Sequence, residues 1–147
     1  MKENDIRRFV DDLVAFNKLL GIHLVGYAQG EARMDMAYSE KLIGDPLRPA
    51  LHGGAIGALI DTCGGAAVWS AASEQDRVST IDLRIDYLRP APLKDLSCLA
   101  KVQRIGSRVG VADMKVWVKG APDDVVATGK GVYHVKRSES QIPHSSG

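Results

Sequence analysis

The chain has 147 residues, of which 45% are hydrophobic and 25% are charged, and its formal net charge at pH 7 is +1. This length and composition are typical of one globular domain with its own hydrophobic core. The near-neutral charge and the absence of basic runs argue against nucleic acid or an anionic membrane as a partner. The start, MKENDIRRFV, lacks the apolar segment of a signal peptide, and the two cysteines show no metal-binding spacing. We therefore expect a cytoplasmic protein with reduced thiols and no bound metal.

The first predicted element is an N-terminal amphipathic helix within residues 1 to 21. Apolar side chains recur at helical spacing from residue 4 to residue 20, and Gly21 can end the helix. Residues 22 to 38 then predict two strands joined near AQGE. The glycine and prolines of the next stretch indicate a loop.

The stretch LHGGAIGALIDTCGGAAVWSAAS, residues 51 to 73, predicts a core helix because it is apolar on nearly every side. Asp61 is the only carboxylate in it. A carboxylate inside a buried helix is costly unless it is hydrogen-bonded or paired. It is therefore either a structural residue bonded to a hydroxyl such as Thr62 or Ser70, or a functional group in a cleft. We favour the functional interpretation.

The rest of the chain alternates between apolar and polar residues and predicts four strands. They cover residues 78 to 88, 96 to 105, 111 to 119 and 125 to 136. Short turns would make them an antiparallel meander, and only the helix of residues 51 to 73 is apolar enough to cover the sheet. The predicted fold is α+β: a curved antiparallel sheet wrapped around one central helix, which is the hot-dog architecture. It would span residues 22 to 136, followed by a disordered polar tail, 137 to 147.

Three segments carry a resemblance to a known family. LHGGAIGALIDTCGGAA, STIDLRIDYLRPA and ATGKGVYHV resemble the hot-dog acyl-CoA thioesterases, and the closest branch is the phenylacetate-pathway type related to hydroxybenzoyl-CoA thioesterases. The likeness runs from about residue 20 to residue 136. It implies hydrolysis of an acyl-CoA thioester without metal or cofactor, by homodimers that commonly pair into homotetramers.

The resemblance also assigns roles to individual residues. Gly53 matches the glycine whose backbone N–H polarises the thioester carbonyl, and His52 matches the histidine before it. Asp61 matches the catalytic carboxylate, and Thr80 stands where relatives have a Ser or Thr that positions the attacking water. Pro46 departs from the pattern, because relatives often carry Asn or Gln there and proline cannot donate a hydrogen bond.

Three further residues are candidates for substrate binding. Gly53 and Gly54 stand at the predicted helix start, where free N–H groups and the helix dipole can stabilise an oxyanion. The alternative is that the two glycines only let the backbone turn into the helix. Arg89 and Arg108 lie at strand ends, where arginine can hold a CoA phosphate in a forked geometry or simply be solvated.

The spacing of Gly53 and Asp61 bears on assembly. Eight residues correspond to about 12 Å along a helix. A reacting carbonyl must lie about 3 Å from the oxyanion donor, with the attacking group equally close to its carbon. One helix can hardly offer both groups to one thioester, so we expect two antiparallel copies of the helix to form two shared sites per dimer. Asp61 would act as general base or as nucleophile.

Two other functions remain open at this stage. A non-catalytic acyl-CoA binding or sensor protein on the same fold is favoured by Pro46. A hydratase or dehydratase of acyl thioesters is less favoured, because those enzymes resemble a different motif around a Pro-Gly turn. Aromatic, short-chain and medium-chain acyl groups all fit the sequence.

Overall fold

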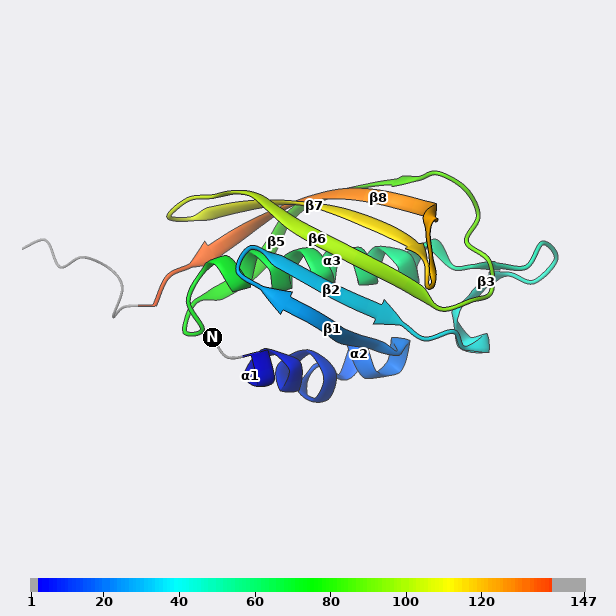
Figure 1. Cartoon of the computed structure of the whole chain (residues 1–147), viewed down its shortest axis with the longest axis horizontal. Helices are drawn as coiled ribbons and strands as arrows, with labels where there is room; N and C mark the ends of the chain where they lie inside the picture. Colours follow the sequence, from blue (N-terminus) through cyan, green and yellow to red (C-terminus); the bar gives the residue numbers. More distant parts are fainter. Residues whose placement is uncertain (1–2, 139–147) are drawn as a thin grey trace, which may run out of the picture.

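The computed structural model describes residues 3 to 138 (Figure 1). The N-terminal segment comprises α1 (Glu3–Arg8), the π-helical turn η1 (Phe9–Leu13) and α2 (Ala15–Leu20). A hairpin of β1 (Ile22–Ala28) and β2 (Glu31–Met36) precedes the 3-10 turn η2 (Glu40–Leu42) and a ribbon of β3 (Ile43–Asp45) and β4 (Ala50–Leu51). The long helix α3 (Gly53–Ala71) is followed by β5 (Arg77–Tyr87), β6 (Leu96–Ile105), β7 (Val109–Val118) and β8 (Ala121–Lys136).

The main sheet is six-stranded, in the order β1-β2-β6-β7-β8-β5, and all neighbouring strands are antiparallel. It curves over α3, which contacts all of its strands (Figure 1). The predicted hot-dog architecture is thus confirmed. Among residues 3 to 138, no helix combines the length and apolar character needed to cross a membrane.

The prediction of a four-stranded meander is wrong for β5. This strand pairs with β8 at the far side of the sheet, whereas β6 lies next to β2. The connection between β5 and β6 contains Pro90 and Pro92, which are unsuited to a tight hairpin. The backbone carbonyl of Ala91 in this connection accepts a hydrogen bond from Leu51 N–H instead, at 3.0 Å. The connection therefore carries the chain from β5 at one edge of the sheet past β8 and β7 to β6.

The core lies between α3 and the concave face of the sheet. Leu59 and Ile60 of α3 are fully buried, and each contributes roughly 1.5 to 3 kcal/mol through the burial of its side chain. The two cysteines, Cys63 and Cys98, are buried and not joined to each other, as predicted. Burial, followed by the proximity of Cys63, raises the pKa of the Cys98 thiol. Both thiols therefore act as small core side chains.

The N-terminal segment is not the single helix that its periodicity predicts. The chain is extended at Val14, with φ −87° and ψ 102°, between η1 and α2. The side chain of Asn17, which is buried, donates to the carbonyl of Val10 at 3.0 Å and satisfies a group freed by this break. Tertiary contacts thus override the local helical pattern.

Two charged side chains attach the N-terminal segment to β1, along which it lies (Figure 1). Asp11 accepts a hydrogen bond from Leu24 N–H at 2.8 Å, and Arg7 donates to the Leu24 carbonyl. These are the backbone groups that Leu24, in the outermost strand, does not use within the sheet. The segment therefore takes the place of a further strand at this position.

The C-terminal end of β8 is held by a buried carboxylate. Asp76, 0% exposed, accepts hydrogen bonds from the backbone N–H groups of Ser73 and Ser138 and from the guanidinium of Arg137. Residues 137 and 138 are therefore ordered, contrary to the expectation of a disordered tail from residue 137. The remainder of that predicted tail, residues 139 to 147, lies outside the described residues.

Replacing Asp76 with Asn is expected to destabilise the fold by about 2 to 3 kcal/mol at neutral pH, because it removes the charge that accepts these bonds. Burial alone would raise the pKa of Asp76, but the bonds from Ser138, Ser73 and Arg137 outweigh it and hold the pKa below the ordinary 3.8. The charged form thus stabilises the fold above pH 3.8, and this contribution is lost as the pH falls toward the folded-state pKa.

Urea denaturation of the wild type and the Asp76→Asn variant measures this effect between about pH 2.5 and about pH 7, that is, from about one unit below to about three units above the ordinary Asp pKa. The gap in free energy of unfolding should be constant near neutrality and shrink in acid. An exposed carboxylate, Asp123, supplies the control as Asp123→Asn. A gap that is equally large at all pH values would contradict the role of the charge.

Candidate active site

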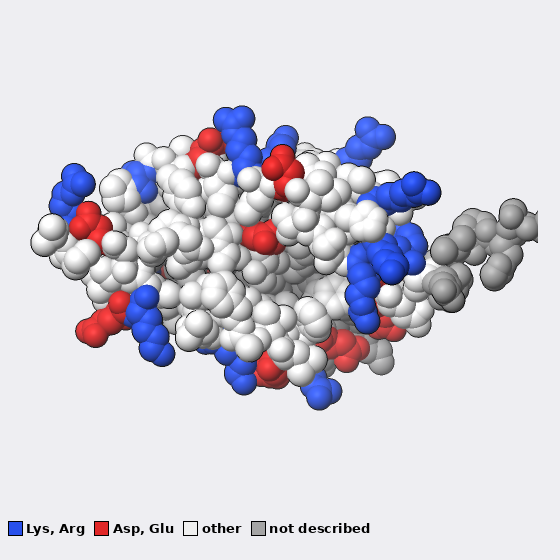
Figure 2. Space-filling model, turned by 180° about the vertical axis from the view of Figure 1, so that it is seen from behind, with Lys and Arg blue, Asp and Glu red and all other residues white. Residues whose placement is uncertain are grey.

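A cavity of about 390 Å³ opens beside α3. Its walls come from the N-terminal segment, from α3, from the start of β5 and from Tyr133 of β8. Figure 2 views the molecule from the side opposite to Figure 1 and shows a hollowed face whose centre is largely uncharged, with charged side chains gathered around the rim. The cavity contains Asp61, so the carboxylate singled out in the sequence lies in a mostly apolar cleft.

Asp61 is partly buried and is held by a hydroxyl of β5. Thr80 Oγ1 donates to Asp61 Oδ1 at 2.7 Å. The hydroxyls considered for a purely structural Asp61 are not its partners: Ser70 donates to the Ala67 carbonyl, and Thr62 forms no such bond in the described structure. A hydroxyl has one proton to donate, so Thr80 can orient the carboxylate and still accept a bond from a water.

A bulge in β5 aims Thr80 at the helix. The register of β5 against β8 shifts between Thr80 and Asp82, which leaves Ile81 outside the pairing and 57% exposed. Thr80 lies opposite Tyr133, and Leu83 lies opposite Gly131, both on the concave face. Strict alternation along the sequence would place Thr80 on the polar side of the strand with Asp82. Because the bulge shifts the register between these two residues, Thr80 faces the site instead.

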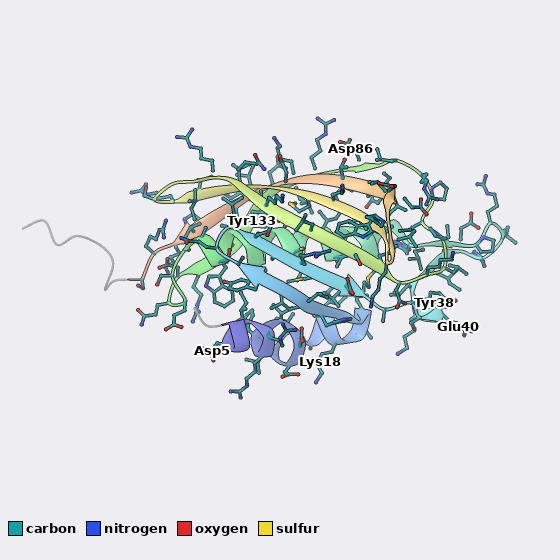
Figure 3. The ribbon with its side chains drawn as sticks, viewed as in Figure 1. Asp5, Lys18, Tyr38, Glu40, Asp86 and Tyr133 are labelled. Carbon is teal, nitrogen blue, oxygen red and sulfur yellow. The ribbon has the colours of Figure 1, made fainter. Side chains whose placement is uncertain are left out.

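Tyr133 fixes the backbone of α3 at the site (Figure 3). Its hydroxyl donates to the Asp61 carbonyl at 3.1 Å, and its side chain is almost fully buried. Burial foremost, and then the charge of Asp61, raises the pKa of the Tyr133 phenol, which therefore stays protonated and able to donate. A Cβ at Gly64 would lie 2.2 Å from this hydroxyl, so only glycine leaves room for it.

The start of α3 is capped by His52. Its Nδ1 accepts a hydrogen bond from Gly54 N–H at 2.7 Å, and its backbone carbonyl accepts from Ala55 N–H at 3.0 Å. This nitrogen is engaged with the helix start, so His52 orients the first turn of α3 through it. Within residues 3 to 138, no group accepts from Gly53 N–H, so it is free to donate to a ligand, unlike the N–H groups of Gly54 and Ala55.

Tyr87, which the sequence reasoning missed, secures the same helix start. Its hydroxyl donates to the Gly53 carbonyl at 2.7 Å, and its ring lies 3.3 Å from the position of a Cβ on Gly53. The alternation in β5 placed Tyr87 on the helix-facing side, but no local signal indicates which turn of α3 it meets.

Within one chain, the candidate groups at the start of α3 do not lie next to Asp61 and Thr80. Asp61 and Thr80 line the cavity described above. His52 and Gly54 line a separate cavity of about 330 Å³, together with Phe16 and residues of the η2 region. Gly53 and Asp61 themselves lie on different turns of α3, as their spacing of about 12 Å predicts.

The arginine candidates are also far apart. Arg89 follows β5 and pairs with Asp124 near the start of β8. Arg108 precedes β7, and its carbonyl accepts from Val135 near the end of β8. They therefore lie at opposite ends of β8 and do not form one phosphate site. Pro46 lies in an exposed turn. In this turn the side chain of Asp45 accepts hydrogen bonds from the backbone N–H groups of Leu47 and Arg48.

The chain is similar to proteins of one family. Residues 49–123 match the Thioesterase superfamily. A Halobacterium salinarum protein, VNG_1336C, which carries a provisional esterase name, is 41% identical over 143 residues, covering 91% of this chain and 92% of that protein. The medium/long-chain acyl-CoA thioesterase YigI of Escherichia coli K12 is 29% identical over 114 residues, covering 69% and 74%.

Solved structures share the fold. The conserved protein PA5202 of Pseudomonas aeruginosa is 26% identical with a TM-score of 0.79, covering 88% of this chain and 98% of that chain. The PaaI protein of the Escherichia coli phenylacetic acid degradation operon is 25% identical with a TM-score of 0.77, covering 92% of each chain.

Proposed function

The chain belongs to the Thioesterase superfamily and is a thioester hydrolase of the hot-dog fold, and on that premise we propose that it hydrolyses acyl-CoA to a free acid and CoA at a site centred on Asp61. The observation that carries this proposal is the Asp61 carboxylate, oriented by Thr80 at 2.7 Å in an apolar cavity. The name of the YigI relative supports acyl-CoA as the substrate class.

The chemistry needs a base or nucleophile and an oxyanion donor. As general base, Asp61 takes a proton from a water whose oxygen attacks the thioester carbon. As nucleophile, its carboxylate attacks that carbon itself, and water then hydrolyses the resulting anhydride. In either case the carbonyl oxygen gains negative charge, the C–S bond breaks and CoA leaves as a thiolate that takes up a proton. The Gly53 N–H at the start of α3 stabilises the oxyanion.

We propose that the Gly53 and Asp61 of one site come from different subunits of a homodimer. The separation of the helix start from Asp61 supports this arrangement, because His52 and Gly54 on either side of Gly53 line a different cavity from Asp61. β5 offers a surface for the second copy, because among residues 3 to 138 it pairs with β8 alone, and Ile81 and Tyr87 in it and Leu88 just after it are more than half exposed. A second β5 paired with it would bring two antiparallel copies of α3 side by side.

Release of free thiol from a panel of acyl-CoAs tests the proposed function. The panel should contain short, medium, long and aromatic acyl groups, and at least one is expected to be hydrolysed with kcat/KM in the ordinary enzymatic range of about 10⁴ to 10⁸ M⁻¹s⁻¹. Thermal protection by CoA esters without thiol release from any of them would contradict hydrolysis and favour a binding protein.

A further inference from the structure

The cavity beside Asp61 has a floor of one stripe of α3. Asp61, Gly65 and Trp69 follow each other at intervals of four residues, so they lie on one face of the helix, and all three line the cavity. Gly65 leaves a gap between the carboxylate and the indole. A Cβ there would be in ordinary contact with the Tyr133 ring at 3.5 Å, so the gap is not required by close packing at this position.

An aromatic pair closes the far end of this stripe. The rings of Phe9 and Trp69 meet edge to face, with centroids 5.0 Å apart and an interplanar angle of 80°. The indole is fixed because its Nε1–H donates to the Ser73 carbonyl at 3.2 Å. Phe9 is fixed from the other side, because the π-helical turn to which it belongs is attached to β1 through Asp11.

The break in the N-terminal segment turns further apolar side chains toward the same space. Val10 and Val14 line the cavity together with Phe9, and Asn17 holds the break in place. The wall that faces the α3 stripe is therefore mainly aliphatic and aromatic, with Asn17 as its polar member, and it belongs to a segment outside the sheet.

We propose that the N-terminal segment measures the acyl chain: the chain lies along the stripe from Asp61 to Trp69, and the Phe9–Trp69 pair stops it. This inference rests on the proposed thioesterase site at Asp61.

The length of the stripe sets the length of the acyl chain. Asp61 and Trp69 are about 12 Å apart along the helix axis. A van der Waals separation of about 4 Å at the rings leaves roughly 8 Å, which about six methylenes fill at ~1.3 Å each, given a C–C bond of about 1.5 Å. The substrate class is thus a medium-chain, unbranched acyl group of about six to eight carbons.

The first test is Gly65→Ala, assayed on saturated acyl-CoAs from butanoyl to dodecanoyl. In the wild type, kcat/KM should rise about fourfold per added methylene, which corresponds to about 0.8 kcal/mol of burial, and stop rising near eight carbons. In Gly65→Ala the added methyl group occupies part of the stripe. The activity on octanoyl-CoA should fall about fourfold relative to butanoyl-CoA, while the melting temperature holds or rises, because alanine favours the helix.

The second test removes one ring of the Phe9–Trp69 pair, so that the cavity should accept longer acyl chains. Phe9→Ala should raise kcat/KM on decanoyl- and dodecanoyl-CoA by about fourfold or more relative to octanoyl-CoA. Leu13→Ala is the matched control, because Leu13 belongs to the same π-helical turn, is 60% exposed and does not line the cavity. It should leave the length profile unchanged. Equal profiles in wild type, Gly65→Ala and Phe9→Ala would overturn the proposal.

Binding separates this inference from the proposed function. Calorimetric titration of the Asp61→Asn variant with the same acyl-CoA series measures the length preference without turnover. Affinity that increases up to about eight carbons and responds to Gly65→Ala supports the measuring role even if the wild type hydrolyses nothing, in which case only the proposed function fails. Hydrolysis with a flat length profile contradicts the measuring role alone.

Discussion

Replacing Asp61 with Asn is expected to lower kcat on the preferred acyl-CoA by a factor on the order of 10² to 10⁴. The amide keeps the size of the side chain. Its oxygen can still accept the hydrogen bond that Thr80 Oγ1 donates to Asp61 Oδ1 at 2.7 Å in the wild type. It removes the base and most of the nucleophilicity. The melting temperature should hold or rise, because a partly buried charge is lost. Steady-state thiol release and thermal denaturation of the same preparation measure both effects.

The Asp123→Asn variant, with an exposed carboxylate changed in the same way, should keep wild-type activity. A structural Asp61 would give the opposite pattern, with activity per folded molecule retained and a lower melting temperature. A single turnover in ¹⁸O-labelled water then tests for a nucleophilic role. Label in the Asp61 carboxylate identifies a nucleophile, because it enters there only when water opens an anhydride at the Asp61 carbonyl, whereas label only in the product acid is expected both of a general base and of an anhydride opened at the acyl carbon.

Replacing Gly53 with Pro is expected to lower kcat by a factor on the order of 10² to 10³, the effect of removing one oxyanion donor. Gly53 is the first residue of α3, where proline is well tolerated, and His52 before it has the extended backbone that a following proline requires, with φ −65° and ψ 129°. The substitution therefore deletes one N–H without breaking the helix. Gly53→Ala is the matched control, because it brings the same Cβ toward the Tyr87 ring and keeps the N–H.

A mixture of the two inactive variants tests whether the site is shared between subunits. In a dimer of one Asp61→Asn chain and one Gly53→Pro chain, one site combines both intact groups and the other combines both defects. After random exchange about half of the dimers are mixed, so about a quarter of the wild-type activity should return. No recovery on mixing, with light scattering showing that subunits have exchanged, would mean that each chain holds a complete site.

The sequence predicted the fold well because its strongest signals are local. An all-apolar helix with a single carboxylate and four alternating strands leave few arrangements in which every apolar face is covered. The position of β5 was not predicted, because strand order depends on which surfaces meet in three dimensions. The break at Val14 was missed for a similar reason: the buried bond from Asn17 to Val10 joins residues whose pattern alone is that of a continuous helix.

The candidate site was predicted on α3 from the sequence pattern and at Thr80 of β5 through the family resemblance. Asp61 and Gly53 stand out in the sequence because of their surroundings, and their roles remain proposals. Thr80 was named through a family resemblance, although simple alternation placed it on the wrong side of β5, and only the bulge explains its contact with Asp61. Phe9 carries no motif, and Tyr133 lies in the segment ATGKGVYHV without a role assigned to it, so their part in the cavity could not be read from the sequence.

The attachment of the N-terminal segment to Leu24 has a consequence for solubility. Open-ended fibres grow when a molecule offers unpaired strand backbone at both margins of its sheet, so that each added copy creates a new place for the next. Here Arg7 and Asp11 occupy the backbone of Leu24 at one margin, and β5 forms the other. In the proposed dimer, growth through strand pairing would end after two copies, because the second copy would use the same strand as the first. The N-terminal segment would then also limit assembly, by occupying the backbone of Leu24 at the opposite edge.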